Sequence, residues 1–399
     1  MSGILRKCKR CLLPETYETL EIAADDSSCN MCRGSEFKNQ NIDWEKRKNQ
    51  FDSIIEKYRG KNDYDCIVPF SGGKDSTFTL YYLVKEYGIK PLVVRFNHGF
   101  YRPGHEENVN RTLRKLGVDF IDFRPNWTIV KRLMKESFDR KTDFCWHCHT
   151  GVYSFPLRIA VRFNVPLVIW GEPLSELSAY YTYEGDDIEF EDEEKFNMVR
   201  NLGITAEDMY GMIHDDDFPV DRRDLLPYTY PTVEELKKLG CYSVCLGSFI
   251  PWDYRKQTRM IMDRLGWVGL DIESAPRDVN GEFAKVECWL QGTRDYVKYL
   301  KRGYSRVTQL VNFEIRNGRM SSEEGQRLVE VYDAFKPASL EVFLEYMGMT
   351  EREFNETVAK FAVAPWEPDF ERDLPETRLQ DMDSWYRENN RKEGEEKRG

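Results

Sequence analysis

From residue 63 onward, short apolar runs of strand length alternate with longer segments whose apolar residues recur at helical spacing. The predicted helices each end at or beside a turn-forming residue, as at Gly88 and Gly117. Strands that alternate with helices of this length form a parallel sheet with helices on both faces, so the predicted fold class is α/β. The predicted strands are 66–70, 92–96, 120–123, 166–170 and 242–246, and the predicted helices between them are 75–87, 106–116 and 151–163.

The regions before and after these alternating strands and helices have different sequence patterns. The first 40 residues are rich in cysteine and turn-forming residues, and helical spacing over 41–59 indicates a connecting helix. From Asp253 onward the pattern is mostly helical. We therefore predict four parts: a cysteine segment over 1–40, an α/β domain over 41–252 with an acidic insertion at about 174–232, a mainly helical domain over 253–386 and a flexible tail over 387–399.

The charge pattern argues against a broad nucleic-acid interface. Asp and Glu number 69 and Lys and Arg 58, so the formal net charge is −11. Binding along a phosphate backbone needs clustered basic residues, and nucleic acid is therefore a disfavoured partner. Within the insertion, residues 184–194 are mostly acidic. A solvated surface is the expected role of such a run, with an interaction surface as the alternative.

The sequence lacks the segments that are typical of membrane and secreted proteins. No apolar run reaches the roughly 18 residues needed to cross a bilayer. The first residues become charged at Arg6, without the apolar core of a secretory signal. We expect a cytoplasmic protein with no membrane partner. In a reducing compartment, ten cysteines indicate metal ligands or redox groups rather than disulfides.

Two CxxC pairs near the N-terminus have the spacing of a zinc site. Cys8 and Cys11 form the first pair, and Cys29 and Cys32 form the second. Four thiolates complete a tetrahedral Zn²⁺ shell with no open position, so the predicted role is structural. A further motif, CWHCH over 145–149, offers two thiolates and two imidazoles. It would hold a metal only with another ligand, and a packed loop that faces the substrate is the alternative.

The sharpest motif is SGGKDS over 71–76, directly after a predicted strand. Its two glycines let the backbone curl into a concave row of N–H groups, and the next helix adds its positive N-terminal end. The spacing differs from that of a Walker A loop and of a GxGxxG fingerprint. The residues expected to bind phosphate are Phe70, Ser71, Gly72, Gly73, Lys74, Asp75 and Ser76.

Polar residues also follow two other predicted strands. Arg95, Asn97 and His98 follow the second strand, and Glu172 follows the fourth. Ligands of parallel sheets bind at this carboxyl edge. We expect Glu172 to hold Mg²⁺, orient the substrate or take a proton from ammonia, and Asp75 to act through Mg²⁺. The alternatives are a hydrogen-bonded loop histidine for His98 and a surface position for Glu172.

The SGGKDS motif resembles the signature of the PP-loop ATP pyrophosphatases. The resemblance implies a five-stranded parallel sheet and cleavage of ATP between its α- and β-phosphates. It also implies that Arg95, Asn97 and His98 recognise the nucleotide. Adenylylation of a carbonyl oxygen turns a poor leaving group into a good one and divides a difficult substitution into two easier steps.

Longer segments resemble the N-acetyl sugar amidotransferases of bacterial surface polysaccharide biosynthesis. The resemblance implies that Lys74, Asp75 and Glu172 help to convert the acetamido group of an N-acetyl sugar or UDP-sugar into an acetamidino group, while ATP gives AMP and pyrophosphate. It extends from about Cys8 to Phe361. The segments that carry it are CKRCLLPET at 8–16, SGGKDS at 71–76, CWHCHTGVYSFPLRIAVRFNVPLVIWGEP at 145–173 and KYLKRGYSRVTQLVNFEIRNGRMSSEEG at 298–325.

Amidination needs ammonia, and the sequence shows no glutaminase of its own. A Cys-His-Glu glutaminase would need a second α/β domain, and an N-terminal-nucleophile glutaminase would need a cysteine where Ser2 stands. We therefore expect ammonia to come from outside the chain. The resemblance implies a glutaminase and a cyclase-like protein as the partners that supply it.

A tRNA thiolase is the alternative function. Some PP-loop thiolases hold an iron–sulfur cluster with a CxxC pair and a distant cysteine, which Cys145, Cys148 and Cys245 resemble. The acidic net charge and the lack of a basic RNA-binding domain oppose this interpretation. A non-catalytic nucleotide-binding module is a third possible function class.

The C-terminal region also contains a cluster of basic residues. Its charge suits a sugar nucleotide or a carboxylate as well as RNA. The cluster comprises Lys298, Lys301, Arg302 and Arg306.

Overall fold

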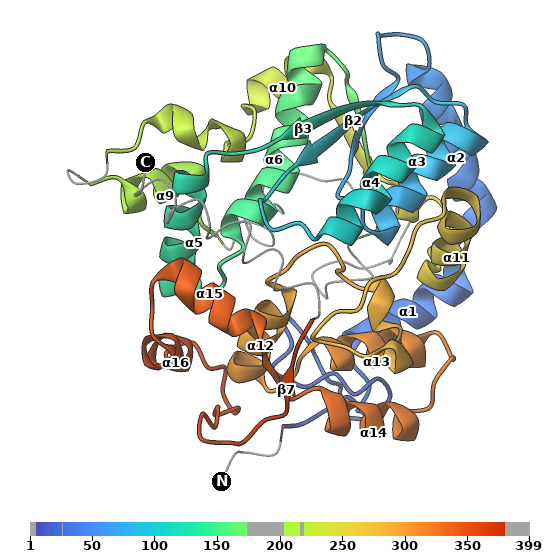
Figure 1. The fold of residues 1–399 in the computed structure, drawn as a ribbon. Helices are drawn as coiled ribbons and strands as arrows, with labels where there is room; N and C mark the ends of the chain where they lie inside the picture. The colour runs from blue at the N-terminus through green and yellow to red at the C-terminus, as the bar shows by residue number, and fades with distance from the viewer. Residues whose placement is uncertain (1–4, 26, 174–202, 216–218, 380–399) are drawn as a thin grey trace. The chain divides into compact units, whose positions relative to one another are not determined.

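The computed structural model describes residues 5–25, 27–173, 203–215 and 219–379. The chain divides into two compact units (Figure 1). One unit comprises residues 36–268, and the other joins residues 1–35 to residues 269–399. The acidic run at 184–194 and the predicted tail at 387–399 lie outside the described residues.

A five-stranded sheet forms the centre of the unit 36–268. All its paired strands are parallel, in the order β3-β2-β1-β4-β5, which confirms the predicted PP-loop type of α/β fold. In the central register, Ile67 pairs with Leu92 on one side and with Val168 on the other. The strands are β1 (Cys66–Pro69), β2 (Pro91–Phe96), β3 (Asp119–Phe123), β4 (Leu167–Trp170) and β5 (Tyr242–Cys245).

The strand order reverses direction between β1 and β4. The chain passes from β1 to β2 and β3 on one side, and then crosses to β4 and β5 on the other. Such a switch point opens a crevice at the carboxyl ends of the two central strands, where ligands of α/β sheets bind. The two segments that leave these strands are the SGGKDS loop and Gly171–Pro173.

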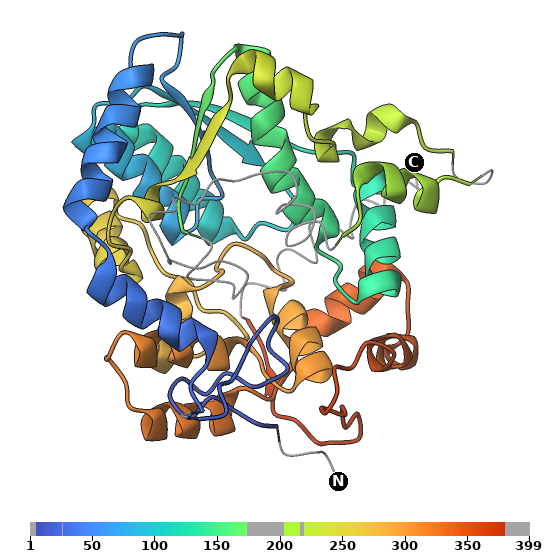
Figure 2. The ribbon, with the colours of Figure 1, turned by 180° about the vertical axis from the view of Figure 1, so that it is seen from behind.

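Helices cover both faces of this sheet. Figures 1 and 2 show α3 (Lys74–Glu86) and α4 (Pro103–Leu116) on one face and α6 (Trp146–Phe163) on the other. Side chains of α6 pack in one buried cluster with apolar residues of β1, β2 and β4. The remaining helices of this unit with seven or more residues in the described part are α2 (Trp44–Tyr58), α5 (Trp127–Lys141), α9 (Ala206–Ile213), η2 (Arg222–Tyr228), α10 (Val233–Leu239) and α11 (Tyr254–Leu265).

Two helices begin earlier than the sequence pattern predicts. α4 begins at Pro103, where a fixed φ and a missing N–H suit the first helical turn. α6 begins at Trp146, so the predicted loop before Gly151 is in fact its first turn. Trp146 is fully buried, and its Nε1 donates to the Ile204 carbonyl at 3.0 Å. This long-range contact fixes the start of α6 and has no local sequence signal.

The described part of the predicted insertion contributes to the core. Met209 and Ile213 of α9 and Tyr228 of η2 are buried in one cluster with Trp146. Thr205 begins α9 with a complete capping box, which satisfies N–H groups at the start of the helix. Residues 203–215 and 219–228 therefore extend the core over α5 and α6.

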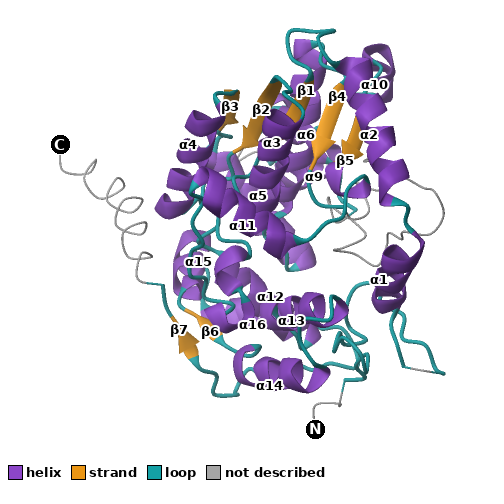
Figure 3. Ribbon diagram, turned by 90° about the vertical axis from the view of Figure 1, so that its right-hand side faces the viewer, coloured by secondary structure: helices purple, strands orange, loops and turns teal. Residues whose placement is uncertain are grey.

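The second unit contains the cysteine segment and a mainly helical C-terminal region. The helical character of that region is as predicted, whereas the sequence pattern treats the cysteine segment as a separate part. Figure 3 shows these helices in purple together with the short parallel pair of β6 and β7. Asp333 fixes the start of one helix, because its carboxylate accepts four hydrogen bonds from the backbone and hydroxyl groups of Ser305 and Thr308. The elements after residue 290 are α12 (Gln291–Arg302), α13 (Arg306–Arg316), α14 (Ser322–Tyr332), β6 (Lys336–Pro337), α15 (Ser339–Met347), α16 (Glu351–Ala359) and β7 (Glu376–Thr377).

One helix belongs to a different part than the sequence pattern suggests. α11 packs against α3 and α4 in the sheet unit, although its sequence lies in the predicted C-terminal domain. Ile261 and Leu265 bury its apolar side there. Among the described residues, no helix is both long and apolar enough to cross a membrane.

Close packing of α6 on β2 gives a stability test. An added Cβ at Gly151 would lie 2.4 Å from the ring of Phe96, which is buried. We expect Gly151→Ala to destabilise the protein by about 1–3 kcal/mol through overpacking, measured by urea unfolding. Gly211→Ala is the control, since Gly211 lies in α9 with no atom within 4 Å of an added Cβ. That variant should gain about 0.5–1 kcal/mol, and equal effects of the two would contradict the assigned packing.

Candidate functional site

The SGGKDS loop lies at the switch point, between β1 and α3. Gly72 has φ +82°, in the left-handed region that favours glycine. A Cβ there would lie 2.3 Å from Val109 and 2.9 Å from the ring of His105. The loop therefore needs glycine at this position for two reasons, its backbone conformation and the close approach of α4.

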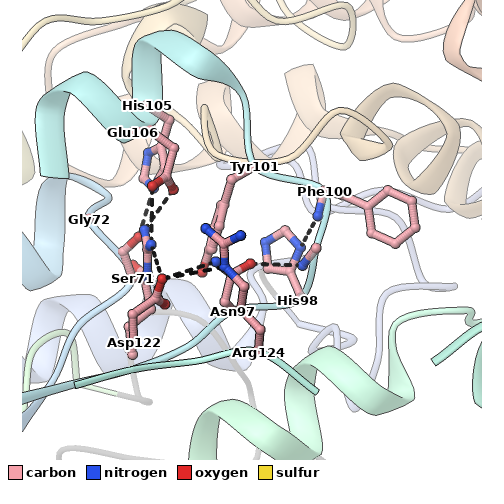
Figure 4. Close-up of polar contacts among 12 residues, drawn as sticks. Ser71, Gly72, Asn97, His98, Phe100, Tyr101, His105, Glu106, Asp122 and Arg124 are labelled. Atoms are coloured by element: carbon pink, nitrogen blue, oxygen red, sulfur yellow. Dashed lines mark hydrogen bonds and ion pairs between the residues drawn. The ribbon is translucent and has the colours of Figure 1, made fainter. Parts of the chain in front are cut away.

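Two hydrogen bonds hold the loop from its outer side. His105 Nε2 lies 2.8 Å from the Ser71 carbonyl oxygen, and Trp267 Nε1 donates to the Gly72 carbonyl at 3.1 Å. Figure 4 shows His105 above the loop. Because the N–H and C=O of a trans peptide point in opposite directions, these bonds turn the Gly72 and Gly73 N–H groups away from His105 and Trp267.

Serine hydroxyls meet those N–H groups on the inner side. Gly72 N donates to Ser76 Oγ at 3.1 Å, and Gly73 N donates to Ser71 Oγ at 3.3 Å. The two hydroxyls lie 3.1 Å apart. An anionic oxygen would accept the same bonds more strongly than a hydroxyl does, so the loop fits a phosphate group.

Lys74 and two carboxylates form the charged centre of the site. Lys74 Nζ forms an ion pair with Asp75, and Glu172 acts on the same ammonium group. Burial lowers the pKa of Lys74, but Asp75 and Glu172 outweigh that effect and raise it above its usual value. Lys74 is therefore a cation at every physiological pH.

Asp75 has a second carboxylate oxygen that could bind a metal ion. This Oδ1 atom is buried and has no hydrogen-bond partner among the described residues, so it fits a role as ligand to a divalent cation.

Glycine also brings Glu172 close to the loop. An added Cβ at Gly171 would lie 2.8 Å from Thr79 Oγ1 and 3.4 Å from the Asp75 carbonyl. The end of β4 thus runs against the first turn of α3. The structure unites Lys74, Asp75 and Glu172 as the sequence predicts.

Tyr254 is a further member of this site that the sequence analysis missed. It is the first residue of α11, and its ring centre lies 5.5 Å from Lys74 Nζ. This cation–π contact supports the charged form of the lysine. The sequence carries no signal for it, because α11 reaches α3 only through tertiary packing.

Arg95 pairs with two protein carboxylates, and the part in nucleotide recognition that the resemblance implies stays a prediction. Its guanidinium donates to both carboxylate oxygens of Asp122, with Nε to Oδ1 at 2.8 Å and Nη2 to Oδ2 at 2.8 Å. It also donates to both carboxylate oxygens of Glu106, at 2.7 and 3.1 Å (Figure 4). The Arg95 side chain is only 3% exposed. Arg95 therefore ties β2 to β3 and α4, and its donors are already committed to protein carboxylates.

Asn97 and His98 order the turn after β2. Asn97 donates to Asp122 at 3.3 Å and accepts from Gly99 N at 3.0 Å. His98 Nδ1 accepts from Phe100 N at 3.2 Å, and its ring contacts Tyr101 at 4.0 Å between centres. Burial, with the other charges nearby, lowers the pKa of His98 well below its usual value, so the imidazole is neutral at pH 7.

Three other histidines lie near enough to His98 to affect its pKa. His105, His147 and His149 all lower the pKa of His98 through their charge, although burial contributes most. Burial likewise lowers the pKa of His147 to about 4. His98 and His147 are therefore neutral at pH 7.

The second cysteine group is not assembled as predicted. Among the described residues, one set of at least three cysteine, histidine or acidic side chains lies within metal-binding distance, and it does not include Cys145, Cys148 or Cys245. Cys245 is fully buried in the apolar cluster beneath α6, at the end of β5. Cys145 and Cys148 instead begin α6. The cluster site implied by the thiolase resemblance is thus absent from the described residues.

The N-terminal cysteines are assembled so that they could hold a metal ion. Cys8, Cys11, Cys29 and Cys32 are buried, and all four Sγ atoms lie within 4.8 Å of one another. Their sulfurs approach at 3.9 Å for Cys8 and Cys32, and at 3.5 Å for Cys11 and Cys29. Hydrogen bonds from the other three thiols lower the pKa of Cys8 well below its usual value. Four sulfur ligands of this kind fit a closed tetrahedral metal ion.

Residues 280–374 match the family described as the C-terminal domain of WbpG-like LPS biosynthesis proteins. This match includes the last of the four segments that carry the resemblance to the sugar amidotransferases, residues 298–325, and it confirms that resemblance.

Two curated relatives match other parts of the chain. An uncharacterized protein of Methanocaldococcus jannaschii is 25% identical over 180 residues, which are 42% of this chain and 63% of that protein. A glutamine-hydrolyzing GMP synthase of Pyrobaculum aerophilum is 33% identical over 87 residues, which are 22% of this chain and 17% of that protein. The chain thus spans less than two thirds of the length of either relative.

Among solved structures, the U34-tRNA thiolase NcsA of Methanococcus maripaludis with its 4Fe-4S cluster is similar at a TM-score of 0.30 and 13% identity, over 82% of this chain and 89% of that one. A predicted subunit of tRNA methyltransferase from Methanocaldococcus jannaschii has a TM-score of 0.22 and 15% identity to this chain. That similarity covers 50% of this chain and 87% of the other. The fold assignment rests on the strand order and the loop, and not on these weak similarities.

The four-cysteine site predicts a bound metal ion. We expect purified protein to hold about one metal ion per chain, because four buried thiolates are costly without a cation. Cys11→Ser should lose that ion and reduce solubility, measured by elemental analysis and gel filtration. Cys288→Ser, in the same unit, is the control and should keep the metal. Metal-free wild-type protein that remains folded would contradict the prediction.

Proposed function

We propose that this chain, whose C-terminal region belongs to the WbpG-like lipopolysaccharide biosynthesis proteins, is the synthetase half of an ATP-dependent N-acetyl sugar amidotransferase. It would convert an acetamido group into an acetamidino group, with AMP and pyrophosphate as the other products. The observation that carries the proposal is the SGGKDS loop at the switch point, with Lys74, Asp75 and Glu172 assembled beside it.

The loop suits pyrophosphate as a leaving group. In the first step, the amide oxygen of the sugar attacks the α-phosphorus of ATP, and the bond to the β-phosphate oxygen breaks. The Gly72 and Gly73 N–H groups and the α3 N-terminus would stabilise the departing pyrophosphate. Lys74 adds a positive charge where negative charge grows.

In the second step, ammonia attacks the activated carbon, and AMP leaves with the former amide oxygen. The attacking nitrogen must lose a proton. Glu172 would accept it, and its position near Lys74 supports this role. Mg²⁺ would be held by Asp75 and would neutralise phosphate charge.

The other parts of the proposal concern metal and partners. Zn²⁺ is the metal we assign to the four-cysteine site, in a structural role. Ammonia would come from a glutaminase and a cyclase-like protein. The substrate would be an N-acetyl sugar or UDP-sugar, and the enzyme would act in the cytoplasm. A thiolase that relied on Cys145, Cys148 and Cys245 is less well supported, because these three do not form a ligand set.

The role of Lys74 can be tested in steady-state kinetics with a UDP-N-acetyl sugar and a high concentration of ammonia. Lys74→Ala should lower kcat by about 10²–10³, because the lost cation acts on charge that develops in the transition state. The KM for the sugar should change far less. Lys85→Ala, at an exposed position of the same helix, is the matched control and should retain wild-type rates.

The reaction course can be tested with an isotope. Oxygen-18 in the acetyl carbonyl should appear in AMP, because that oxygen leaves with the adenylyl group. Mass spectrometry of the nucleotide and phosphate products gives the answer. Label in inorganic phosphate, or ADP as the product, would exclude adenylylation.

A further inference from the structure

The chain leaves α11 through a short segment, residues 266–268, that reaches the SGGKDS loop. α11 ends at Gly266, which has φ +70°, and Trp267 N donates to the Ile261 carbonyl at 3.3 Å. This is a Schellman motif, in which a left-handed glycine turns the chain sharply out of the helix. Beyond the turn, the Trp267 side chain is buried and in contact with the loop.

Trp267 acts on the loop through one carbonyl group. Its Nε1 donates to the Gly72 carbonyl oxygen at 3.1 Å. Thr77 Oγ1, near the start of α3, donates to the same oxygen at 3.3 Å. Thr77 lies five residues from Gly72, so its bond forms within the local loop and helix, whereas Trp267 lies 195 residues away. The Trp267 bond therefore depends on the tertiary packing of α11.

Side chains of α4, which packs against α11, hold the 266–268 segment in this position. Asn108 is buried, and its Nδ2 donates to the Val268 carbonyl at 2.7 Å while its Oδ1 accepts from Val268 N at 2.9 Å. Arg111 donates to the Gly266 carbonyl at 2.8 Å. His105, one turn before Asn108, bonds the other held carbonyl of the loop. One face of α4 thus fixes both the loop and the segment that contacts it.

The Trp267 bond also affects the N–H group at the other end of the same peptide. The Gly72 carbonyl and the Gly73 N–H belong to one peptide group. Hydrogen bonds along a chain polarise one another, so donation to this carbonyl makes the Gly73 N–H a better donor. Gly73 N donates to Ser71 Oγ at 3.3 Å, on the side of the loop that fits a phosphate oxygen.

We propose that Trp267 is a positioning residue of the SGGKDS loop, and that residues 266–268 form a latch that favours polyphosphate binding. The inference rests on the proposed function for the identity of that ligand, pyrophosphate or ATP. The proposed chemical steps use the loop N–H groups and Lys74, and they give Trp267 no part. Because coupling between two sites is reciprocal, a latch that improves binding must itself be stabilised by the bound ligand.

Calorimetry on the full chain tests the positioning role, with inorganic pyrophosphate and Mg²⁺ as the probe. Trp267→Phe keeps an aromatic ring and removes the N–H donor. It should weaken pyrophosphate binding about three- to tenfold, because a hydrogen bond that presets the loop is lost. Trp146→Phe is the matched control, since Trp146 is also buried and its Nε1 donates to a carbonyl outside the loop, that of Ile204. The two variants should lose similar thermal stability, but the control should bind as the wild type does.

A second variant tests the latch without a change in the loop or in Trp267. Asn108→Asp keeps the acceptor for Val268 N and loses the donor to the Val268 carbonyl. It should weaken pyrophosphate binding in the same direction as Trp267→Phe does. Asn110→Asp adds the same charge at an exposed position of α4, and it should bind pyrophosphate as the wild type does.

Hydrogen exchange gives a readout that a merely structural role would not move. Saturating pyrophosphate should slow amide exchange in residues 266–268 of the wild type, since a stabilised latch opens less often. The Val268 N–H is the amide to follow, because Asn108 accepts its hydrogen bond. Mass spectrometry of peptides gives the exchange rates, and Trp267→Phe should lose the protection that pyrophosphate confers on this segment.

Several results would overturn the proposal. Wild-type affinity in Trp267→Phe, or an equal loss of affinity in Trp146→Phe, would show that the Trp267 bond is only structural. Exchange in residues 266–268 that pyrophosphate leaves unchanged would contradict the latch. Wild-type protein that binds neither pyrophosphate nor ATP would overturn the proposed function, and this inference with it. The two failures are distinguishable, because the first results leave wild-type binding intact.

Discussion

The site depends on how two carbonyl groups of one loop are held. His105 from α4 and Trp267 from the segment after α11 fix the carbonyls of Ser71 and Gly72. They come from elements 34 and 195 residues away in sequence, so the loop has its conformation only when α4 and α11 are packed on α3. The left-handed backbone at Gly72 and its close contact with Val109 allow that packing.

Two buried lysines show how the surroundings of an ammonium group set its chemistry. Lys74 faces Asp75 and Glu172, and these carboxylates raise its pKa despite burial. Burial, together with Arg306 and Arg294, lowers the pKa of Lys298 to about 8, although Asp295 acts in the opposite direction. Lys74 is thus a permanent cation suited to a leaving group. Burial lowers the pKa of both lysines, and the nearby carboxylates and cations decide the net direction of the shift.

Long-range partners decide what Arg95 and Cys245 contact. Arg95 follows a strand at the edge where ligands bind, yet Asp122 and Glu106 already occupy its donors. Cys245 resembles a cluster ligand by its spacing, but the pleat of β5 turns it into the apolar core. In both cases residue type and spacing were right, and a long-range partner decided the role.

The sequence by itself determined the parallel α/β fold, the phosphate loop and the four-cysteine site. Each of these is set by local rules: strand and helix periodicity, the two glycines of the loop, and the short spacing within each CxxC pair. Tertiary structure decided the start of α6 at Trp146, the place of Tyr254 beside Lys74 and the grouping of α12 with α13 around Asp295. These features depend on burial and on charges that meet across distant parts of the chain, and periodicity carries no record of such contacts.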